Sequence, residues 1–237
     1  MAPVAWPQIV LDGARAVQNF TPAELAGQHI PIGLWGYSGG GLAPAWAAEL
    51  QSAYAPELNI VGSAEGGVPA DFRDLVAANS GSSAFGLMFA AAVGLSRQYP
   101  EMDLDGLLND TGRRLREAIS AQCVSGVLQT GSGLSFDRVT TRPDAINTPG
   151  VRGAIEHNTP GGAAPKAPVL LYHSLADAAV PTHEADALFG RYCQLHATVQ
   201  YEHSPFTDNV LPAIMSLPSV HGFFDGRFAG APPVSTC

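Results

Sequence analysis

The stretch Ile30-Pro-Ile-Gly-Leu-Trp-Gly-Tyr-Ser-Gly-Gly-Gly-Leu42 decides the fold of this chain. An apolar run from Ile30 to Trp35 leads into a Gly-Tyr-Ser-Gly-Gly segment, and small, helix-forming residues follow. Strand, sharp turn and helix form the context in which the G-x-S-x-G pattern marks a nucleophile elbow. The turn lifts the serine hydroxyl clear of the sheet, and the next N–H faces the place where an oxyanion forms. The pattern therefore predicts Ser38 as a nucleophile and Gly39 as an oxyanion donor.

Glycines stand on both sides of Ser38, and the predicted turn needs them. The nucleophile of an elbow sits in strained backbone, and its neighbours pass close to one another, so small residues are required there. Gly36 and Gly40 are expected to provide that space. An ordinary serine in a glycine-rich turn is the alternative, because the bare pattern is common by chance. The buried strand before it and the helix after it favour the elbow.

The overall composition narrows the class of protein. The chain has 237 residues, of which 46% are hydrophobic and 14% charged, and its formal net charge is −9. This length suffices for one domain with a proper core and an inserted cap. A negative chain without a basic, aromatic-rich patch is poorly suited to nucleic acid. No apolar run is long enough to span a bilayer, and no histidine or cysteine spacing predicts a metal site, so no cofactor is expected.

Helix and strand signals alternate at the two ends of the chain. Apolar periodicity and small-residue content predict helices over residues 6–19, 40–54, 182–195, 211–217 and 220–228. Short apolar runs predict strands over residues 30–35, 59–63, 169–173 and 198–202. This alternation predicts an α/β fold with a mostly parallel sheet and crossover helices on its faces.

The strand signal fades in the middle of the chain. Residues 70–165 are therefore expected to form a mainly helical cap, inserted into a core made of residues 1–69 and 166–237. Helices are expected over residues 71–78, 84–97 and 111–123, and loops over the proline-rich stretch 131–168. The helix over 84–97 is apolar on nearly all sides, as expected for a core helix or for one that covers an apolar ligand. The core interpretation is the more common.

A serine nucleophile needs a general base, and the base needs an orienting carboxylate. In folds with this elbow the order along the chain is Ser, then Asp or Glu, then His. Asp177 follows the buried strand 169–173, where open α/β sheets place their chemistry, and is the expected acid. The alternative is a turn-forming aspartate, which is common in loops.

Four histidines follow the expected acid, and their positions differ. His183 lies too close to the acid along the chain, and His196 lies at the wrong end of the sheet, so both are taken as ordinary histidines. His203 follows the last expected strand at its carboxyl end and is the expected base. His221 lies in the last helix.

The remaining sequence signals concern redox state and targeting. Cys123, Cys193 and Cys237 allow one disulfide with one cysteine left over, or three free thiols. The first residues carry neither a positive segment nor an apolar stretch, so no secretory signal is expected there.

Together with these residues, the ending Phe224-Asp-Gly-Arg-Phe-Ala-Gly-Ala-Pro-Pro-Val-Ser-Thr-Cys237 gives the chain a clear resemblance. The chain resembles the secretory lipase family, which includes the A-type lipase of Candida antarctica and many actinobacterial secreted lipases. The matching stretches run across almost the whole chain: residues 36–40, 54–62, 67–71, 99–101, 172–181 and 227–230.

The resemblance implies an α/β-hydrolase fold with a helical cap and hydrolysis of acyl esters, triacylglycerols among them. It also implies Ser38 as nucleophile, Asp177 as acid, secretion, and transient contact with lipid interfaces. Cys193 and Cys237 correspond to a retained disulfide, and Cys123 to the orphaned partner of a cysteine further upstream in the family.

Two departures from the family bear on activity. Family members are much longer before the elbow, in a part that carries early strands and the second oxyanion donor. Apolar surface is therefore expected to be exposed beside the first strand. The family's histidine position matches Asn209, and asparagine cannot usefully take the proton of Ser38. Either His203, six positions earlier, serves as base, or the triad is incomplete.

The sequence thus supports functions of different classes. The first is a lipase or carboxylesterase with Ser38, Asp177 and His203 as its triad. The second is a catalytically impaired relative that binds lipid or has a structural role. A third keeps the triad but acts on another substrate class, as a peptidase does.

Overall fold

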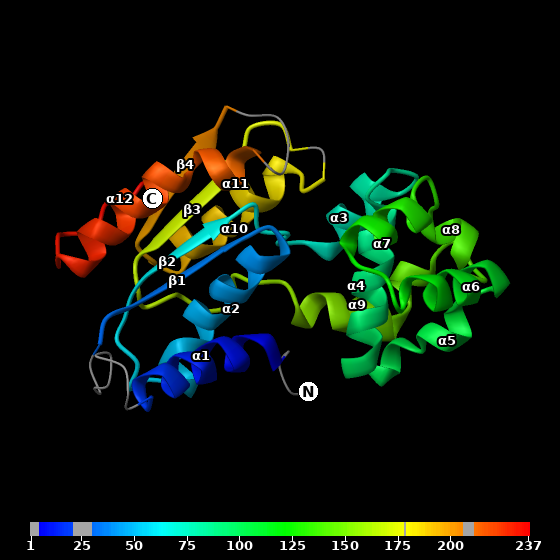
Figure 1. Ribbon diagram of the computed structural model, residues 1–237, viewed down its shortest axis with the longest axis horizontal. Helices are drawn as coiled ribbons and strands as arrows, with labels where there is room; N and C mark the ends of the chain where they lie inside the picture. Colours follow the sequence, from blue (N-terminus) through cyan, green and yellow to red (C-terminus); the bar gives the residue numbers. More distant parts are fainter. Residues whose placement is uncertain (1–4, 21–29, 178, 206–210) are drawn as a thin grey trace. The chain divides into compact units, whose positions relative to one another are not determined.

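The computed structural model describes residues 5–20, 30–177, 179–205 and 211–237. The chain divides into two compact units. We call them the α/β unit, made of residues 5–70 and Pro160–Cys237, and the helical unit, Asp71–Thr159 (Figure 1). The described sheet lies in the α/β unit.

The sheet has four parallel strands in the order β1-β2-β3-β4. They are β1 (Ile32–Tyr37), β2 (Ile60–Gly66), β3 (Val169–Ser174) and β4 (Val199–Ser204). Because the chain moves across the sheet in one direction, right-handed crossovers place their helices on the same face. The sheet confirms the predicted parallel α/β fold.

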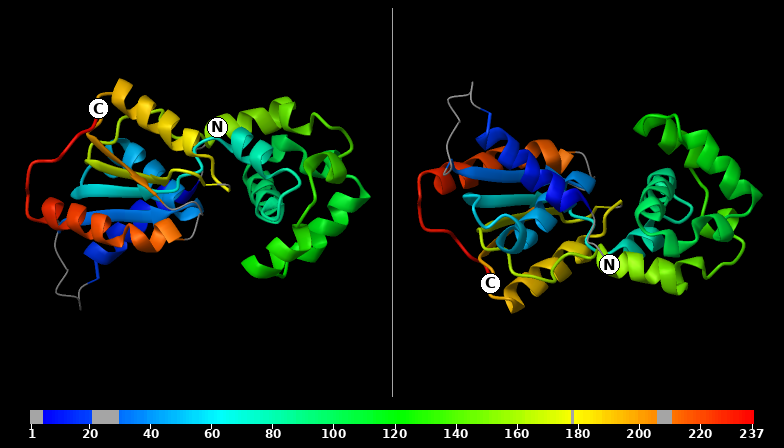
Figure 2. Two further views of the ribbon diagram at one scale, coloured as in Figure 1. Left: turned by 90° about the horizontal axis from the view of Figure 1, so that it is seen from above. Right: turned by 90° about the horizontal axis from the view of Figure 1, so that it is seen from below.

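Helices cover both faces of this sheet (Figure 2). One face carries α2 (Gly39–Tyr54) and α10 (Thr182–Gln194), and the other carries α12 (Leu217–Phe228), which follows the short α11 (Leu211–Met215). On the α12 face, Val220 packs with Ala64, Leu170 and Tyr172. A Cβ at Gly33 would lie 2.5 Å from Phe224, so glycine lets α12 approach β1.

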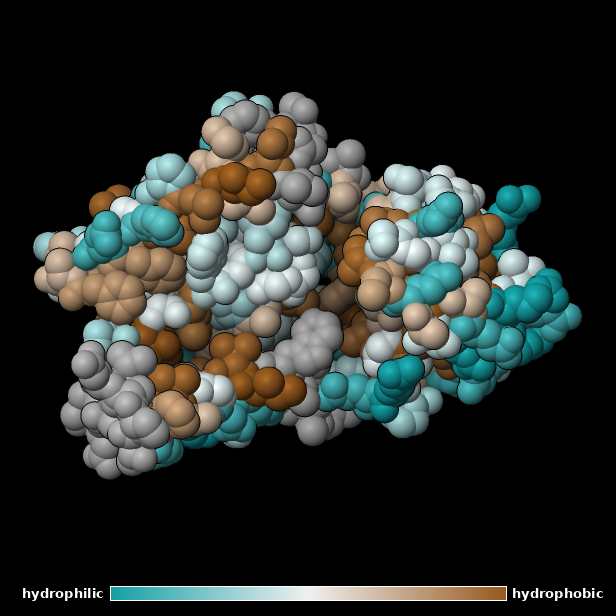
Figure 3. Space-filling view, in the orientation of Figure 1, coloured by the Kyte–Doolittle hydropathy of each residue, from teal (hydrophilic) through white to brown (hydrophobic). Residues whose placement is uncertain are grey.

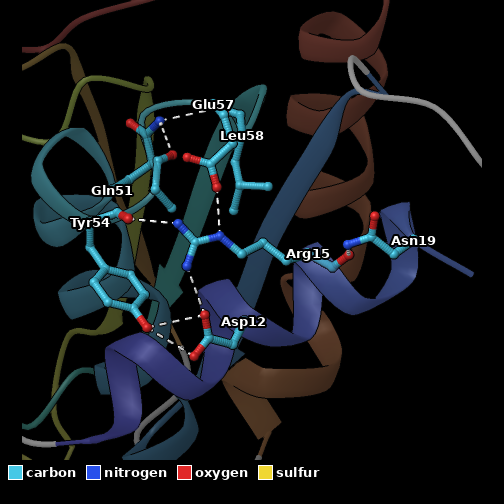
Figure 4. Close-up of polar contacts among 8 residues, drawn as sticks. Asp12, Arg15, Asn19, Gln51, Tyr54, Glu57 and Leu58 are labelled. Carbon is cyan, nitrogen blue, oxygen red and sulfur yellow. Dashed lines mark hydrogen bonds and ion pairs between the residues drawn. The ribbon is translucent and has the colours of Figure 1, made fainter.

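Helix α1 (Ala5–Gln18) packs on α2, with Leu11 fully buried against both β1 and α2. Figure 4 shows the polar contacts that join these elements. Arg15 donates to Glu57 at 2.5 Å, to Asp12 at 2.8 Å and to the Tyr54 carbonyl at 2.7 Å. These ion pairs are exposed, so each alone contributes little to stability. Together they fix the direction of α1 across α2.

Strand β1 is an edge of the described sheet, and hydrophobic side chains reach the surface beside it. Trp35 of β1 is 48% exposed, and Ile9 and Val17 of α1 are 64% and 45% exposed. Figure 3 shows hydrophobic side chains gathered on this side of the α/β unit. The apolar surface expected beside the first strand is therefore present in the described part of the chain.

The C-terminal tail returns to the outer side of β4. A disulfide joins Cys193 of α10 to Cys237, and the Thr236 N–H donates to the Val199 carbonyl at 2.8 Å. The disulfide implied by the resemblance is thus present, and Cys123 is a free, exposed thiol.

The helical unit contains α3 to α9 around its own core. Their bounds are α3 (Phe72–Asn79), α4 (Phe85–Gln98), α5 (Leu104–Leu107), α6 (Asp110–Ile119), α7 (Val124–Gly131), α8 (Phe136–Val139) and α9 (Pro149–His157), with 3-10 turns at Pro100–Met102 and Ala145–Asn147. The core packs Phe85 and Phe89 of α4 against α6, α7 and α8. No described helix is long and apolar enough to cross a membrane.

The stretch expected to be loop-rich, 131–168, contains a nine-residue helix, α9. The sequence did not predict this helix, because Pro149 was taken as a breaker. Pro149 in fact stands at the start of α9, where its missing N–H is not needed and its fixed φ favours the helix. Similarly, the expected helix over 111–123 ends earlier, at Ile119, and α7 begins after Cys123.

Strand β2 also extends beyond its expected end at Ser63 and includes Glu65, which the sequence placed in a turn. Glu65 is fully buried and accepts a hydrogen bond from the Ser63 hydroxyl at 2.7 Å. Its other oxygen lies 3.5 Å from the Tyr192 hydroxyl. Burial raises the pKa of Glu65 to about 8, so the carboxyl is mostly neutral at pH 7, and a neutral carboxyl fits inside a sheet.

A second buried carboxyl, Glu49 of α2, lies in the same cluster. It accepts the Tyr192 hydroxyl at 3.0 Å and the backbone N–H groups of Gly161, Gly162 and Ala163 at 2.6, 3.1 and 3.2 Å. Burial raises the pKa of Glu49 as well, and these four donors oppose the rise. The cluster joins α2, β2 and α10 to the stretch by which the chain returns to the α/β unit.

Glu65 makes stability depend on pH. Its pKa in the folded protein is about 8, against an ordinary value of 4.5. The folded state therefore keeps a proton that the unfolded state releases between these values, and the free energy of unfolding falls as pH rises through that window, by at most about 1.4 kcal/mol per pH unit. We expect Glu65→Gln to remove most of this slope in urea unfolding at pH 5, 7 and 9. Glu57→Gln, at an exposed carboxylate, is the matched control. An unchanged slope in Glu65→Gln would contradict the assignment.

Candidate functional site

Ser38 occupies the turn between β1, which ends at Tyr37, and α2, which begins at Gly39. Its backbone has φ 56° and ψ −130°, a conformation that a non-glycine residue rarely adopts. The Ser38 N–H donates to the Gly66 carbonyl at 2.8 Å, which ties the turn to the end of β2. Such strain persists only where the surrounding structure imposes it, as in a nucleophile elbow.

The glycines around Ser38 have unequal roles. A Cβ at Gly36 would lie 1.9 Å from the Gly40 carbonyl oxygen, and one at Gly41 would lie 2.4 Å from the Gly66 carbonyl oxygen. A Cβ at Gly40 would meet no described atom within 4 Å. Gly36 is thus required as expected, whereas the close approach on the helix side falls on Gly41 and not on Gly40.

Gly39 is the first residue of α2 and is exposed. N–H groups in the first turn of a helix have no carbonyl partner within the helix. The Ser38 side chain makes no capping hydrogen bond, and the first turn of α2 holds no acidic residue. The amino end of α2 is therefore suited to stabilise negative charge beside Ser38.

Asp177 lies in the loop after β3 and is 7% exposed. One carboxylate oxygen accepts the N–H groups of Ala179 and Val180 at 2.8 and 2.9 Å. This arrangement makes Asp177 the organiser of its own turn, at the carboxyl end of a strand two positions from β1. The aspartate can combine this structural role with that of an acid.

His203 lies inside β4 and not after it, because the strand continues to Ser204. Its Nε2 atom is 3.6 Å from Asp186 of α10, and its ring centroid is 4.4 Å from that of Tyr201. Three strand spacings, about 14 Å, separate β4 from β1. In this arrangement the described contacts of His203 are with α10 and β4, and a single side chain does not span the distance to Ser38.

An apolar cavity opens within the helical unit. Its volume is about 60 Å³, and it is partly open to solvent. Helix α4 contributes Met88, Ala91, Ala92 and Leu95 to its lining, while Phe85 and Phe89 of the same helix pack in the core of the helical unit. The core interpretation is confirmed for Phe85 and Phe89, and the ligand-cover interpretation stays a prediction for the residues of α4 that line the cavity. Thr140 is the polar residue among those that line the cavity.

Comparison with known proteins places the chain in a family. A family model described as secretory lipase matches residues 5–236. The chain belongs to the secretory lipase family. A probable inactive lipase of Mycobacterium tuberculosis is 34% identical over 227 residues, which cover 94% of this chain and 51% of that protein. Lipase A of Moesziomyces aphidis is 28% identical over 243 residues, covering 96% and 51%.

The X-ray structure of Candida antarctica lipase A superposes on this chain with a TM-score of 0.91 and 27% identity, covering 98% of this chain and 56% of that one. The likeness confirms the α/β-hydrolase fold. The chain spans about half the length of the curated relatives it matches.

The other histidines that follow Asp177 lie at the surface of the chain. His183 and His221 are exposed on α10 and α12, and His196 is exposed before β4. Asn209, which the resemblance predicts to stand at the family's histidine position, lies outside the described residues. The described part of the chain contains no group of three residues able to hold a metal ion.

One histidine near the site was not singled out in the sequence. His173 stands in β3, is fully buried, and has its Nε2 atom 2.9 Å from the Val180 carbonyl oxygen. Its sequence signal was a histidine inside an apolar run four residues before Asp177. Apolar runs predict burial, but only the fold shows which carbonyl the ring meets.

The unequal glycines give a test of the elbow. We expect Gly36→Ala to destabilise the protein by about 3 kcal/mol or more, because the new methyl group meets the backbone of Gly40. Gly40→Ala places a methyl group in open space and is expected to change stability by less than about 1 kcal/mol. Urea unfolding of the two variants measures the contrast. Equal stability of the two variants would show that Gly36 and Gly40 do not approach as described.

Proposed function

We propose that this secretory lipase hydrolyses acyl esters, with Ser38 as nucleophile. The strained backbone of Ser38 between a strand and a helix is the observation that carries the proposal. A turn of this kind costs stability, and the cost is explained if it presents a reactive hydroxyl. Membership of the secretory lipase family supports the ester substrate.

The chemistry follows from the site. The Ser38 Oγ atom attacks the ester carbonyl carbon, and the Gly39 N–H stabilises the oxyanion of the tetrahedral intermediate. The alcohol leaves with a proton, an acyl-enzyme forms, and water releases the acid by the reverse sequence. Asp177 orients the base. His203 is the proposed base, and it can serve only if the end of β4 rearranges, because it must leave its contact with Asp186 and come within reach of Ser38.

The apolar cavity of the helical unit is itself proposed to bind an acyl chain. Its lining is almost wholly hydrocarbon, so it offers little to a peptide backbone, which needs hydrogen-bond partners. The cavity therefore favours a lipid or other acyl ester over a peptide. Secreted triacylglycerol lipases among the relatives, such as that of Malassezia furfur, are consistent with action outside the cell at lipid interfaces.

The second candidate function is acyl binding without efficient turnover. His203 is held by α10 three strands from Ser38, and the family position of the base is Asn209. A similar protein of Mycobacterium tuberculosis bears the name probable inactive lipase. Binding in the cavity does not depend on a base, so it survives the loss of one.

A fluorophosphonate probe tests the nucleophile. We expect it to label the wild-type protein at Ser38, identified by peptide mass spectrometry, and not to label Ser38→Ala. If His203 is the base, His203→Ala slows labelling by about 1,000-fold, because the base and nucleophile act as a unit. His196→Ala, at an exposed histidine, is the matched control.

Labelling that is unchanged in His203→Ala would remove His203 from the mechanism. A folded wild-type protein that stays unlabelled would reject the hydrolase proposal and leave acyl binding, which a fluorescent fatty acid displaced by oleate would then measure.

Asn209→His separates the two candidate functions. If turnover is limited by the absent base, this variant raises the hydrolysis rate of a p-nitrophenyl ester by about 100-fold or more, the usual contribution of a positioned base. Asn209→Gln, which adds no base, is the control. A folded Asn209→His variant with the wild-type rate would show that the base at this position does not limit turnover.

A further inference from the structure

We propose that His173 is a positioning residue that holds the Asp177 carboxylate in its working orientation. The proposal rests on the proposed function of Asp177 as the acid, but the contacts that carry it are structural. His173 and Asp177 do not need to touch, because the Val180 residue connects them.

The first contact lies between β3 and the loop that follows it. His173 is fully buried on the face of β3 opposite to Tyr172, and Tyr172 packs with α12. The ring thus faces the α10 side of the sheet. Its Nε2 atom lies 2.9 Å from the Val180 carbonyl oxygen, which can only accept, so Nε2 carries the proton and donates.

The second contact joins the same residue to the acid. The Val180 N–H donates to the Asp177 carboxylate at 2.9 Å, and the Ala179 N–H donates to the same oxygen at 2.8 Å. The backbone of Val180 therefore has its carbonyl fixed by His173 and its N–H engaged with Asp177. The Val180 side chain is buried, so the residue cannot turn freely to other partners.

The protonation state of His173 suits this role. Burial lowers the pKa of His173, which keeps the ring neutral at pH 7 with a single N–H. The Nδ1 atom is buried with no partner in the described chain, so the hydrogen bond to Val180 determines the tautomer. A buried, neutral ring with one donor keeps the same hydrogen bond, whereas the protonation state of an exposed histidine would change with pH.

The structure also explains why another buried residue at position 173 would not hold the Val180 carbonyl. Leucine fills the space but donates nothing, which leaves the Val180 carbonyl buried without its donor. Asparagine carries its amide nitrogen near the position of Nδ1. Glutamine carries it near the position of Nε2 and can still reach Val180. The three substitutions at position 173 therefore separate the effect of filling the buried space from the effect of donating a hydrogen bond to the Val180 carbonyl.

Two measurements on the full chain test the inference. Hydrogen exchange reports the Ala179 and Val180 amides, and ester hydrolysis reports kcat and KM with p-nitrophenyl butyrate. We expect His173→Leu and His173→Asn to speed exchange of both amides by about tenfold or more, and to lower kcat by about 10- to 100-fold with KM nearly unchanged. We expect His173→Gln to restore both readouts to within about threefold of wild type.

Leu171→Ala is the matched control, because Leu171 is fully buried in β3 and faces the same side as His173. It should lower the melting temperature while leaving local exchange of the two amides and kcat near wild type. If His173→Gln behaves as His173→Leu does, or if neither alters the two amides, the inference is overturned.

The exchange readout also keeps the inference separate from the proposed function. If the wild-type protein hydrolyses no ester and takes up no fluorophosphonate, the hydrolase proposal fails. The exchange pattern of the Leu, Asn and Gln variants still decides whether His173 holds the Asp177 turn.

Discussion

The Gly66 carbonyl is the contact on which the elbow depends. It accepts the N–H of Ser38 at 2.8 Å and lies so close to Gly41 that a methyl group there would collide with it. The end of β2 thus meets both the turn and the first turn of α2. With Gly36 pressed against the Gly40 carbonyl, the backbone of Ser38 has little freedom to relax from its positive φ. The rest of the α/β unit serves to keep β1, β2 and α2 in this arrangement.

Polar groups buried below the elbow show how that arrangement is maintained. Glu49 of α2 and Glu65 of β2 meet through Tyr192 of α10. Two adjacent carboxyls can be buried because one is neutral and the other receives several donors, which avoids an unpaired charge in the core. At the next strand, His173 gives its single N–H to the loop that contains Asp177. The proposed nucleophile, Ser38, and the proposed acid, Asp177, are therefore each held by hydrogen bonds to the backbone, whereas His203 is held by an exposed pair with Asp186.

The features that sequence could predict are local ones. A buried strand followed by glycines, a serine and a helix is a continuous signal, so the turn at Ser38 was predicted between its strand and its helix, and Asp177 was placed after its strand in the same way. The features that sequence missed depend on tertiary packing. The sequence placed Glu65 in a turn, because only the fold shows that this residue is buried beside Tyr192 and mostly neutral. Pro149 resembles a breaker although it begins a helix, and β4 runs two residues further than its apolar pattern. That shift of a strand end moved His203 from a loop into the sheet.

The central claim is that Ser38 is a formed nucleophile, whatever the efficiency of the base. Intact-mass spectrometry during incubation with p-nitrophenyl butyrate tests it most directly, because slow proton transfer also slows deacylation and an acyl-enzyme then accumulates. The account predicts one added butyryl group, mapped by peptide sequencing to Ser38 and absent from Ser38→Ala. A folded protein that gains no acyl group while releasing no nitrophenol, or that gains it equally in Ser38→Ala, would contradict the account.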